Sequence, residues 1–341
     1  MSKSKSFRAG VISAGAIAQA CHLPGYAKNR HVELVAIADP TVARHKEVLA
    51  QYPDVRAYKT HQEMLAKEDL DVVSVCSPNV YHARQVIAAL EAGCHVLCEK
   101  PMALTLGDAD AMIVASKKAR RKLMIGFTHR LLRGNQRCKQ MLKERALGKP
   151  FMMRARFAHG GPLAGWAKGT WFYDKRMAGG GALLDMGIHA IDLCLWMMGP
   201  IKSVSANTAT IVKKIPVDDN AVLSLEFANG ALGYIEVGWT SQPGFVGTEI
   251  YGTKGSLINN YLTGLQLCAG KASAGTDDVT KWKMLDRKPA TGGWPIEIDS
   301  WIDVVRGKEK LTMTGTTGRN ALEVALAAYE SSKTGRRITL K

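Results

Sequence analysis

The strongest constraint on the fold is an alternation, between residues 7 and 127, of short apolar runs with longer amphipathic segments. Short runs that are apolar at nearly every position are typical of parallel strands covered on both faces. Because crossovers between such strands are right-handed, the alternation predicts a doubly wound parallel sheet. The expected strands are 7–13, 32–38, 72–76, 95–98 and 123–127, and the expected helices are 17–28, 41–51, 81–92 and 106–120.

The later part of the chain has a period of two instead. Leu223, Leu225 and Phe227 fall on one face of an extended segment, and Asn229-Gly230 after it is a strong hairpin signal. Such a pattern predicts an open, mostly antiparallel sheet with helices on one face. The expected strands are 151–157, 204–212, 221–227, 233–239, 248–251 and 255–259, and the expected helices are 182–198, 296–306 and 316–332.

Length and composition fit this division. The 341 residues suit two domains of roughly 100–200 residues each. We expect an α/β protein with an N-terminal Rossmann doubly wound parallel sheet in 1–125 and a C-terminal α/β domain with a large open mostly antiparallel sheet in 126–341. No apolar stretch approaches the ~20 residues that span a bilayer, and the N-terminus lacks a secretory apolar region. We therefore expect a cytoplasmic protein with no membrane partner.

Charge and cysteine usage narrow the classes further. A net charge of +16 suits a nucleic-acid binder or an enzyme for anionic substrates. The basic residues are spread along the chain, and the dense run 117–122 falls at an expected helix end, where cations are favoured. Since no aromatic-basic platform or helix-turn-helix pattern occurs, we expect no nucleic-acid partner. The seven cysteines lie mostly in apolar runs without zinc-ribbon spacing, which indicates buried reduced thiols and no metal.

The first strand leads into the segment 13–18, whose pattern S-x-G-x-x-A is a variant of the dinucleotide fingerprint. Gly15 stands where the backbone approaches a pyrophosphate, and the helix that follows would present its amides to the phosphates. Ser13 replaces the first glycine of the pattern. Serine fits there in the β region and is strained if φ is positive.

Asp39 ends the second expected strand, where an acidic residue binds the adenosine ribose hydroxyls. A carboxylate there repels a 2′-phosphate, so NAD is favoured over NADP. Arg44 lies nearby and leaves NADP as the alternative. Asp39 would equally suit the N-terminus of the helix expected after Pro40, where an acid is favoured without any cofactor contact.

Two further loops, Ser77-Pro78-Asn79 and Glu99-Lys100-Pro101, leave the carboxyl ends of expected strands. Ligands of open α/β sheets bind at these ends. Asn79 and His82 would equally suit a helix cap and a first helical turn. The expected cofactor-binding residues are Ala14, Gly15, Ala16, Ile17, Asp39, Ser77, Pro78, Asn79, His82, Glu99 and Lys100.

Together with the segment Gly179–Asp192 and the turn Tyr251–Gly255, these motifs resemble the Gfo/Idh/MocA oxidoreductase family over nearly the whole length. The Glu-Lys-Pro loop and the D-x-G-x-H-x-x-D pattern are more specific than the glycine loop. The resemblance implies a Rossmann domain, a C-terminal open sheet that builds homodimers or homotetramers, and a cis peptide before Pro101.

The resemblance also places Lys100, Asp185 and His189 in the active site. Asp185 and His189 lie four residues apart on an expected helix and share a face, which Asp192 could join. A neutral imidazole accepts a hydroxyl proton near neutral pH, Asp185 can hold the ring, and Lys100 can stabilise a negative oxygen. From the residues alone, a buried polar network, a surface face or a metal site explains the Asp–His–Asp set as well as catalysis does.

Aromatic and basic residues before this helix are candidates for sugar contacts, since rings stack on sugars and arginine binds hydroxyl or acidic groups. Trp166 and Tyr173 are weaker candidates, and core packing explains each ring equally well. The expected substrate-binding residues are Lys100, Arg130, Trp171, Phe172, Asp185 and His189.

We expect an NAD-dependent oxidoreductase that transfers a hydride between the nicotinamide and a secondary hydroxyl of a sugar, inositol or related polyol. Transfer between two sugars without cofactor release is a variant. An alternative is an NAD-dependent glycoside-cleaving enzyme that works by transient oxidation and elimination. A non-enzymatic dinucleotide-binding regulator is disfavoured, because Lys100 and His189 are both present.

Overall fold

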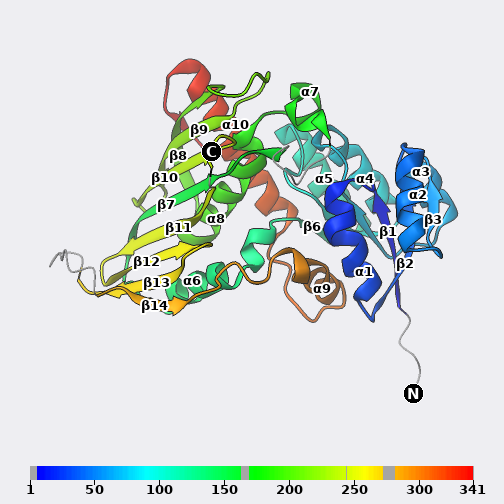
Figure 1. Ribbon diagram of the computed structural model, residues 1–341, viewed down its shortest axis with the longest axis horizontal. Coiled ribbons are helices and arrows are strands. Elements are labelled where there is room, and N and C mark those ends of the chain that lie inside the picture. The colour runs from blue at the N-terminus through cyan, green and yellow to red at the C-terminus, as the bar shows by residue number, and fades with distance from the viewer. Residues whose placement is uncertain (1–5, 163–168, 243, 272–280, 341) are drawn as a thin grey trace. The chain divides into compact units, whose positions relative to one another are not determined.

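The computed structural model describes residues 6–162, 169–242, 244–271 and 281–340. The chain forms two compact units, each with its own sheet and helices (Figure 1). The first unit comprises Met1–Phe127 and Trp294–Leu322, and the second comprises Thr128–Gly293 and Glu323–Lys341. The chain returns to the first unit at Trp294. No pattern in the sequence predicted this return.

The first unit is built on a parallel sheet of order β3-β2-β1-β4-β5-β6, which confirms the doubly wound prediction. All four residues of β4 are buried, because helices cover both faces of the sheet. The strand β3 has three residues and was missed, since so short a segment shows no pattern. The strands are β1 (Phe7–Ile12), β2 (Val32–Ala38), β3 (Arg56–Tyr58), β4 (Val72–Val75), β5 (His95–Cys98) and β6 (Leu123–Ile125).

Two helices of this unit begin with side-chain caps that the sequence provides. The hydroxyl of Thr60 accepts the amide of Glu63, and that of Thr105 accepts the amide of Asp108. The basic run 117–122 begins in the last turn of α5, as expected. The helical elements are η1 (Ala18–His22), α1 (Leu23–Lys28), α2 (Val42–Gln51), α3 (His61–Lys67), η2 (Asn79–Tyr81), α4 (His82–Glu91), α5 (Leu106–Ala119), α9 (Trp294–Val305) and the first part of α10 (Gly315–Thr334).

The second unit contains a mixed sheet of order β14-β13-β12-β11-β7-β10-β9-β8-β15. Its described pairs are antiparallel except β7 with β10, which run parallel. The prediction of an open mostly antiparallel sheet is confirmed, and the expected strand 151–157 pairs antiparallel with one neighbour and parallel with the other. The strands are β7 (Pro150–Ala158), β8 (Ile201–Ala209), β9 (Asn220–Phe227), β10 (Leu232–Gly238), β11 (Phe245–Gly252), β12 (Gly255–Asn260), β13 (Gly264–Ala269), β14 (Lys283–Asp286) and β15 (Ile338–Thr339).

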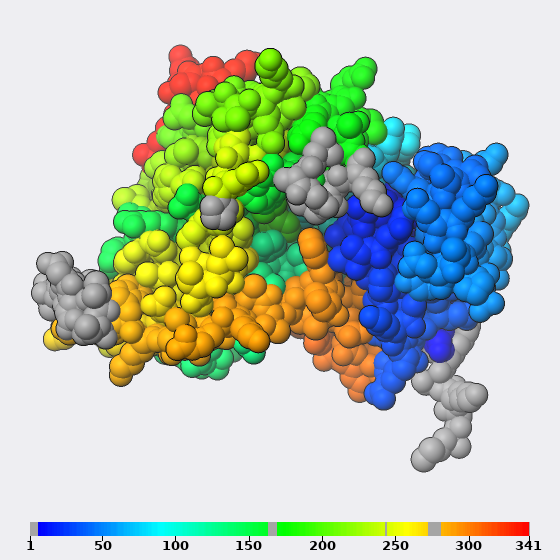
Figure 2. Space-filling model, viewed as in Figure 1, coloured from blue at the N-terminus to red at the C-terminus, as the bar shows by residue number. Residues whose placement is uncertain are grey.

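The hairpin between β9 and β10 turns at Asn229-Gly230 as predicted, with Gly230 at φ +83°. Leu223, Leu225 and Phe227 are all buried on one face, where α8 and η6 pack on the sheet. The end of α10 and the segment after it, red in Figure 2, lie at the surface. The helical elements of this unit are η3 (Thr128–Leu131), α6 (Arg133–Lys143), η5 (Thr170–Tyr173), α7 (Lys175–Ala178), η6 (Leu183–Gly187), α8 (Ile188–Met198) and the last part of α10.

One helical stretch of the described residues, Lys175–Met198, is long and apolar enough by composition to cross a bilayer. The most apolar window of this stretch is 83% buried inside the protein, which is typical of a core helix. All seven cysteines are unpaired and six of them are buried, in agreement with the expectation of buried thiols.

The turn after β1 resolves the question that Ser13 posed. Ser13 has φ +70°, in the left-handed region that glycine adopts without strain. Its amide donates to the carbonyl of Ala38 at 2.7 Å, so the conformation is fixed by the neighbouring strand. Ser13 therefore carries a strain that the glycine of the usual fingerprint avoids.

We expect substitutions at Ser13 to rank by their tolerance of positive φ. Ser13→Gly removes a strain of roughly 1–2 kcal/mol against an entropic cost of roughly 0.5–1 kcal/mol, so stability should rise by up to about 1.5 kcal/mol. Ser13→Val, which is β-branched, should lose about 1–3 kcal/mol. Urea unfolding of the three proteins without cofactor measures this order. A valine variant as stable as the glycine variant would contradict it.

Candidate functional site

The loop after β1 fits close approach of a ligand to its backbone. A Cβ atom added at Gly15 would meet only the Ser13 hydroxyl, at 3.9 Å, among atoms within 4 Å. The packing of the protein therefore does not require a glycine there, whereas a dinucleotide pyrophosphate does. Ala16 is exposed, and Gly15 and Ile17 are half-buried at the start of the helix, so this end is accessible. The residues fit NAD, and the helix N-terminus would hold its phosphates.

Asp39 anchors this loop from the end of β2. Its carboxylate accepts the amides of Ala14 at 2.9 Å and Thr41 at 2.8 Å, and pairs with the guanidinium of Arg44 at 3.0 Å. Burial alone would raise the pKa of Asp39, but these amides and the guanidinium outweigh it and hold the pKa below its usual value. The side chain is fully buried. Asp39 thus has a structural role in shaping the loop, and its contact with the adenosine ribose stays a prediction.

The loops that follow β4 and β5 are joined by His82. Its ring is fully buried, and its nitrogens face the carbonyl of Pro101 at 2.8 Å and the carbonyl of Ser77 at 2.7 Å. The hydroxyl of Ser77 donates to Gln85 at 2.6 Å. The peptide between Lys100 and Pro101 is cis, as the resemblance implied. His82 therefore acts on this edge of the sheet by fixing two neighbouring loops.

Glu99 fixes the loop that carries Lys100. One carboxylate oxygen of Glu99 lies 3.1 Å from Nε2 of His22, and the other accepts the amide of Lys100 at 3.3 Å. Behind His22, Nδ1 lies 2.9 Å from the Ser74 hydroxyl, which lies 2.7 Å from the hydroxyl of Tyr26. Lys100 itself is half-buried. The side chain of Glu99, predicted to bind the cofactor, thus contacts protein groups in this unit.

In the second unit, Asp185 and His189 lie on consecutive helical elements, η6 and α8. The expected α-helix begins with a π-helical turn, a variation that often marks functional sites. The carboxylate of Asp185 accepts the indole N–H of Trp239 at 3.3 Å. Both Asp185 and His189 are buried, with 7% and 5% of their surface exposed, so bulk water reaches neither freely.

The Gly179–Gly181 turn holds the start of this helix against the segment that precedes β9. The carboxylate of Asp218 accepts the amides of Gly181 and Leu183, each at 2.8 Å. A Cβ atom at Gly181 would come within 1.9 Å of the carbonyl oxygen of Asp218, so only glycine fits. The glycine-rich segment before Asp185 therefore serves close packing of this helix.

His189 lies beside a second histidine that the sequence did not indicate. The ring centroid of His129 is 4.4 Å from that of His189 and 5.1 Å from that of Phe157. Nδ1 of His129 lies 3.1 Å from the hydroxyl of Tyr261. The environment of the His189 ring is therefore mostly aromatic on this side.

Arg130 and Asp192 form a buried bidentate ion pair. Nε and one terminal nitrogen of Arg130 each donate to a carboxylate oxygen of Asp192 at 2.7 Å, and the guanidinium lies over the ring of Trp196. Burial raises the pKa of Asp192 to about 6, and Arg130 offsets this only in part. This pair links η3 to α8, so Arg130, which was predicted to bind substrate, has a structural partner in Asp192.

The aromatic candidates before the helix pack together. The rings of Trp171 and Phe172 stack at 3.9 Å, and Tyr173 meets Trp239 edge-on at 5.7 Å. Phe172 and Tyr173 also pack on the buried cluster around Trp239. Trp166 lies outside the described residues.

Sequence reasoning missed His129, Trp239 and Asp218 as neighbours of the predicted catalytic residues. Trp239 and Asp218 belong to the sheet region, far from the helix in sequence, and no local pattern connects them to it. His129 lies in the segment just beyond the last strand of the parallel sheet, and this position was the one available signal.

Comparisons with known proteins agree with this geometry. Residues 7–127 match the domain described as "Oxidoreductase family, NAD-binding Rossmann fold", and residues 135–258 match the GFO/IDH/MocA C-terminal domain. D-glucoside 3-dehydrogenase of Escherichia coli K12 is 27% identical, over 99% of this chain and 98% of its own. Myo-inositol 2-dehydrogenase of Thermotoga maritima is 29% identical, over 98% of each chain.

A solved structure supports the same assignment. The WlbA dehydrogenase from Bordetella pertussis, in complex with NADH and UDP-GlcNAcA, superposes with a TM-score of 0.84 at 27% identity, over 99% of both chains. Both domains match the family, the fingerprint loop is present, and the glycine-led helical segment carries Asp185 and His189. This chain therefore belongs to the Gfo/Idh/MocA family of NAD-binding oxidoreductases.

Proposed function

We propose that this enzyme oxidises a secondary hydroxyl of a sugar, inositol or related polyol, or reduces the corresponding ketone, with His189 as the acid–base group and Lys100 as the oxygen-stabilising group. The observation that carries the proposal is the buried imidazole of His189 on the helix that also presents Asp185. The relatives named for glucoside and inositol dehydrogenation support the substrate class.

Each residue has a role that follows from its chemistry. NAD⁺, when bound, supplies the hydride-accepting centre. His189 accepts the hydroxyl proton during oxidation and returns it during reduction. The ammonium of Lys100 donates a hydrogen bond to the same oxygen and stabilises its developing negative charge. Asp185, held by Trp239, stabilises the protonated imidazole. The rings of Trp171 and Phe172 offer an apolar surface for a sugar face.

A parallel screen of polyols, aldoses, uronic acids, glycosides and nucleotide sugars, each with NAD⁺ and NADP⁺, tests the function. We expect reduced cofactor to accumulate with at least one of these classes. Uronic acids and nucleotide sugars belong in the screen because the net charge of +16 favours anionic substrates. Release of an aglycone without net reduced cofactor would instead support the glycoside-cleaving alternative. Light scattering of the same preparation tests a separate expectation, that the protein is a homodimer or homotetramer.

Removal of the imidazole should separate catalysis from cofactor binding. We expect His189→Ala to lower kcat by about 10²–10⁴-fold and to leave the Kd for NADH near that of the wild type, because the fingerprint loop is in the other unit. Stopped-flow or steady-state kinetics and NADH fluorescence measure the two effects. His31→Ala, which changes a histidine between α1 and β2, is the matched control. Turnover by His189→Ala close to the control would remove His189 from this role.

The cofactor preference should depend on the charge of Asp39. Asp39→Asn retains an oxygen acceptor for the amide of Ala14 but removes the repulsion of a 2′-phosphate. We therefore expect the ratio of kcat/KM for NAD⁺ to that for NADP⁺ to fall by about 10–100-fold, the Coulomb effect of one charge at short range. Arg44→Ala, which deletes the nearby cation, should move this ratio in the opposite direction. An unchanged ratio in both variants would show that neither residue meets the ribose.

A further inference from the structure

Glu297 on α9 is a buried acid that the proposed chemistry does not use. In the first unit, α9 packs on η1 and α1, and Gly25 permits the close contact, since a Cβ atom there would come within 2.5 Å of Ile298. Glu297 has 1% of its surface exposed. Within the described parts of the chain, neither of its carboxylate oxygens has a hydrogen-bond partner. An ionised carboxylate left this way would cost several kcal/mol or more.

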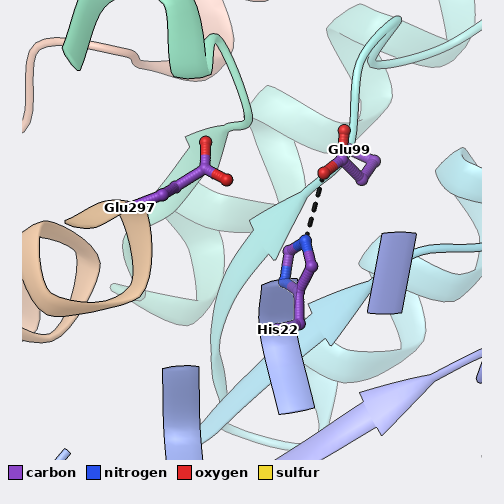
Figure 3. Close-up of side chains that lie close together, drawn as sticks. All are labelled: His22, Glu99 and Glu297. Carbon is purple, nitrogen blue, oxygen red and sulfur yellow. Dashed lines mark hydrogen bonds and ion pairs between the residues drawn. The ribbon is translucent and has the colours of Figure 1, made fainter. Parts of the chain in front are cut away.

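The carboxyl group of Glu297 points toward Glu99 and His22 (Figure 3). One side-chain atom of each residue, a ring nitrogen of His22 and a carboxylate oxygen of each glutamate, lies within 4.8 Å of the other two, and all three residues are buried. Two carboxylates at this separation in a buried site cannot both stay ionised without a compensating positive charge or a proton. The arrangement therefore requires one of the two acids to be neutralised.

The partners of the two acids decide which one. Glu99 contacts Nε2 of His22 at 3.1 Å and the amide of Lys100 at 3.3 Å, so its negative charge is stabilised. Burial alone would raise the pKa of Glu99, but His22 and Lys100 hold it below its usual value. No group in the described segments donates to Glu297 in this way, and burial together with the charge of Glu99 raises its pKa well above the ordinary value.

Three further titratable groups lie near enough for the charge of Glu297 to act on their pKa values: Cys21 of η1, Tyr26 of α1 and Cys76 just after β4. None of these three groups can supply a positive charge. Burial raises the pKa of all three, so they are neutral at physiological pH. His22 directs Nε2 to Glu99 and Nδ1 to Ser74.

We propose that Glu297 carries a proton in the folded protein, and that Glu99 and Glu297 form a pair with a single negative charge on Glu99. This pair determines the charge next to the Lys100 loop, because Glu99 accepts the Lys100 amide. Glu297 is a positioning residue in this account. Its consequence for catalysis rests on the proposed role of Lys100, whereas the protonation state itself does not.

Stability as a function of pH tests the proposal without an activity assay. Because the folded pKa of Glu297 is raised, the folded state holds a proton that the unfolded state has already lost above about pH 5. The free energy of unfolding of the wild type therefore falls as pH rises toward the folded pKa. Glu297→Gln cannot titrate at this position, so its free energy of unfolding does not fall for this reason. The unfolding constant of the wild type relative to Glu297→Gln should rise by about tenfold per pH unit in that window.

The matched control is Glu91→Gln, at an exposed position of α4, whose ratio to the wild type should stay constant with pH. A constant ratio for Glu297→Gln as well would overturn the proposal. If Glu297→Gln fails to fold, infrared spectroscopy of the wild type still decides, since a protonated side-chain acid gives a carbonyl stretch that disappears on alkaline titration. Absence of that band at pH 7, or one divalent cation per chain by elemental analysis, would overturn the proposal.

Discussion

Buried carboxylates that accept main-chain amides fix the loops on which the proposed site depends. Asp39 holds the fingerprint loop through the amide of Ala14, Glu99 holds the Lys100 loop, and Asp218 holds the first turn before Asp185. Hydrogen bonds to an ionised acceptor are shorter and roughly twice as strong as neutral ones. Such a link therefore orders an irregular segment that has no ladder of its own to stabilise it.

This construction has an electrostatic cost that the surrounding residues must offset. The charge of Asp39 is offset by two amides and Arg44, and that of Asp192 is offset in part by the bidentate contact with Arg130. Among the residues that the structure describes, Glu297 has no such partner, which makes it the exception among these buried acids. A proton is the simplest compensation there, since it removes the charge without requiring a new contact. The same physical rule thus explains both the ionised acids and the neutral one.

The sequence predicted the parallel sheet, the Asn229-Gly230 hairpin and the glycine-led helix, because these depend on local periodicity and turn chemistry. It did not predict the positive φ of Ser13, which the contact with Ala38 of the adjacent strand imposes. Nor did it place His129 beside His189, Trp239 beside Asp185, or α9 with Glu297 against η1. Those contacts join segments far apart in the chain, and a single sequence holds no pattern that pairs them.

We propose above that this chain moves a hydride between a carbohydrate-type carbinol and bound NAD. The most direct measurement is isotope transfer, in which a substrate found by the screen is deuterated at its carbinol carbons and incubated with the enzyme and NAD⁺. If hydride passes to NAD⁺, deuterium should appear at C4 of the nicotinamide, as detected by NMR or mass spectrometry. Substrate conversion during which no deuterium enters the cofactor, even transiently, would contradict hydride transfer to NAD⁺.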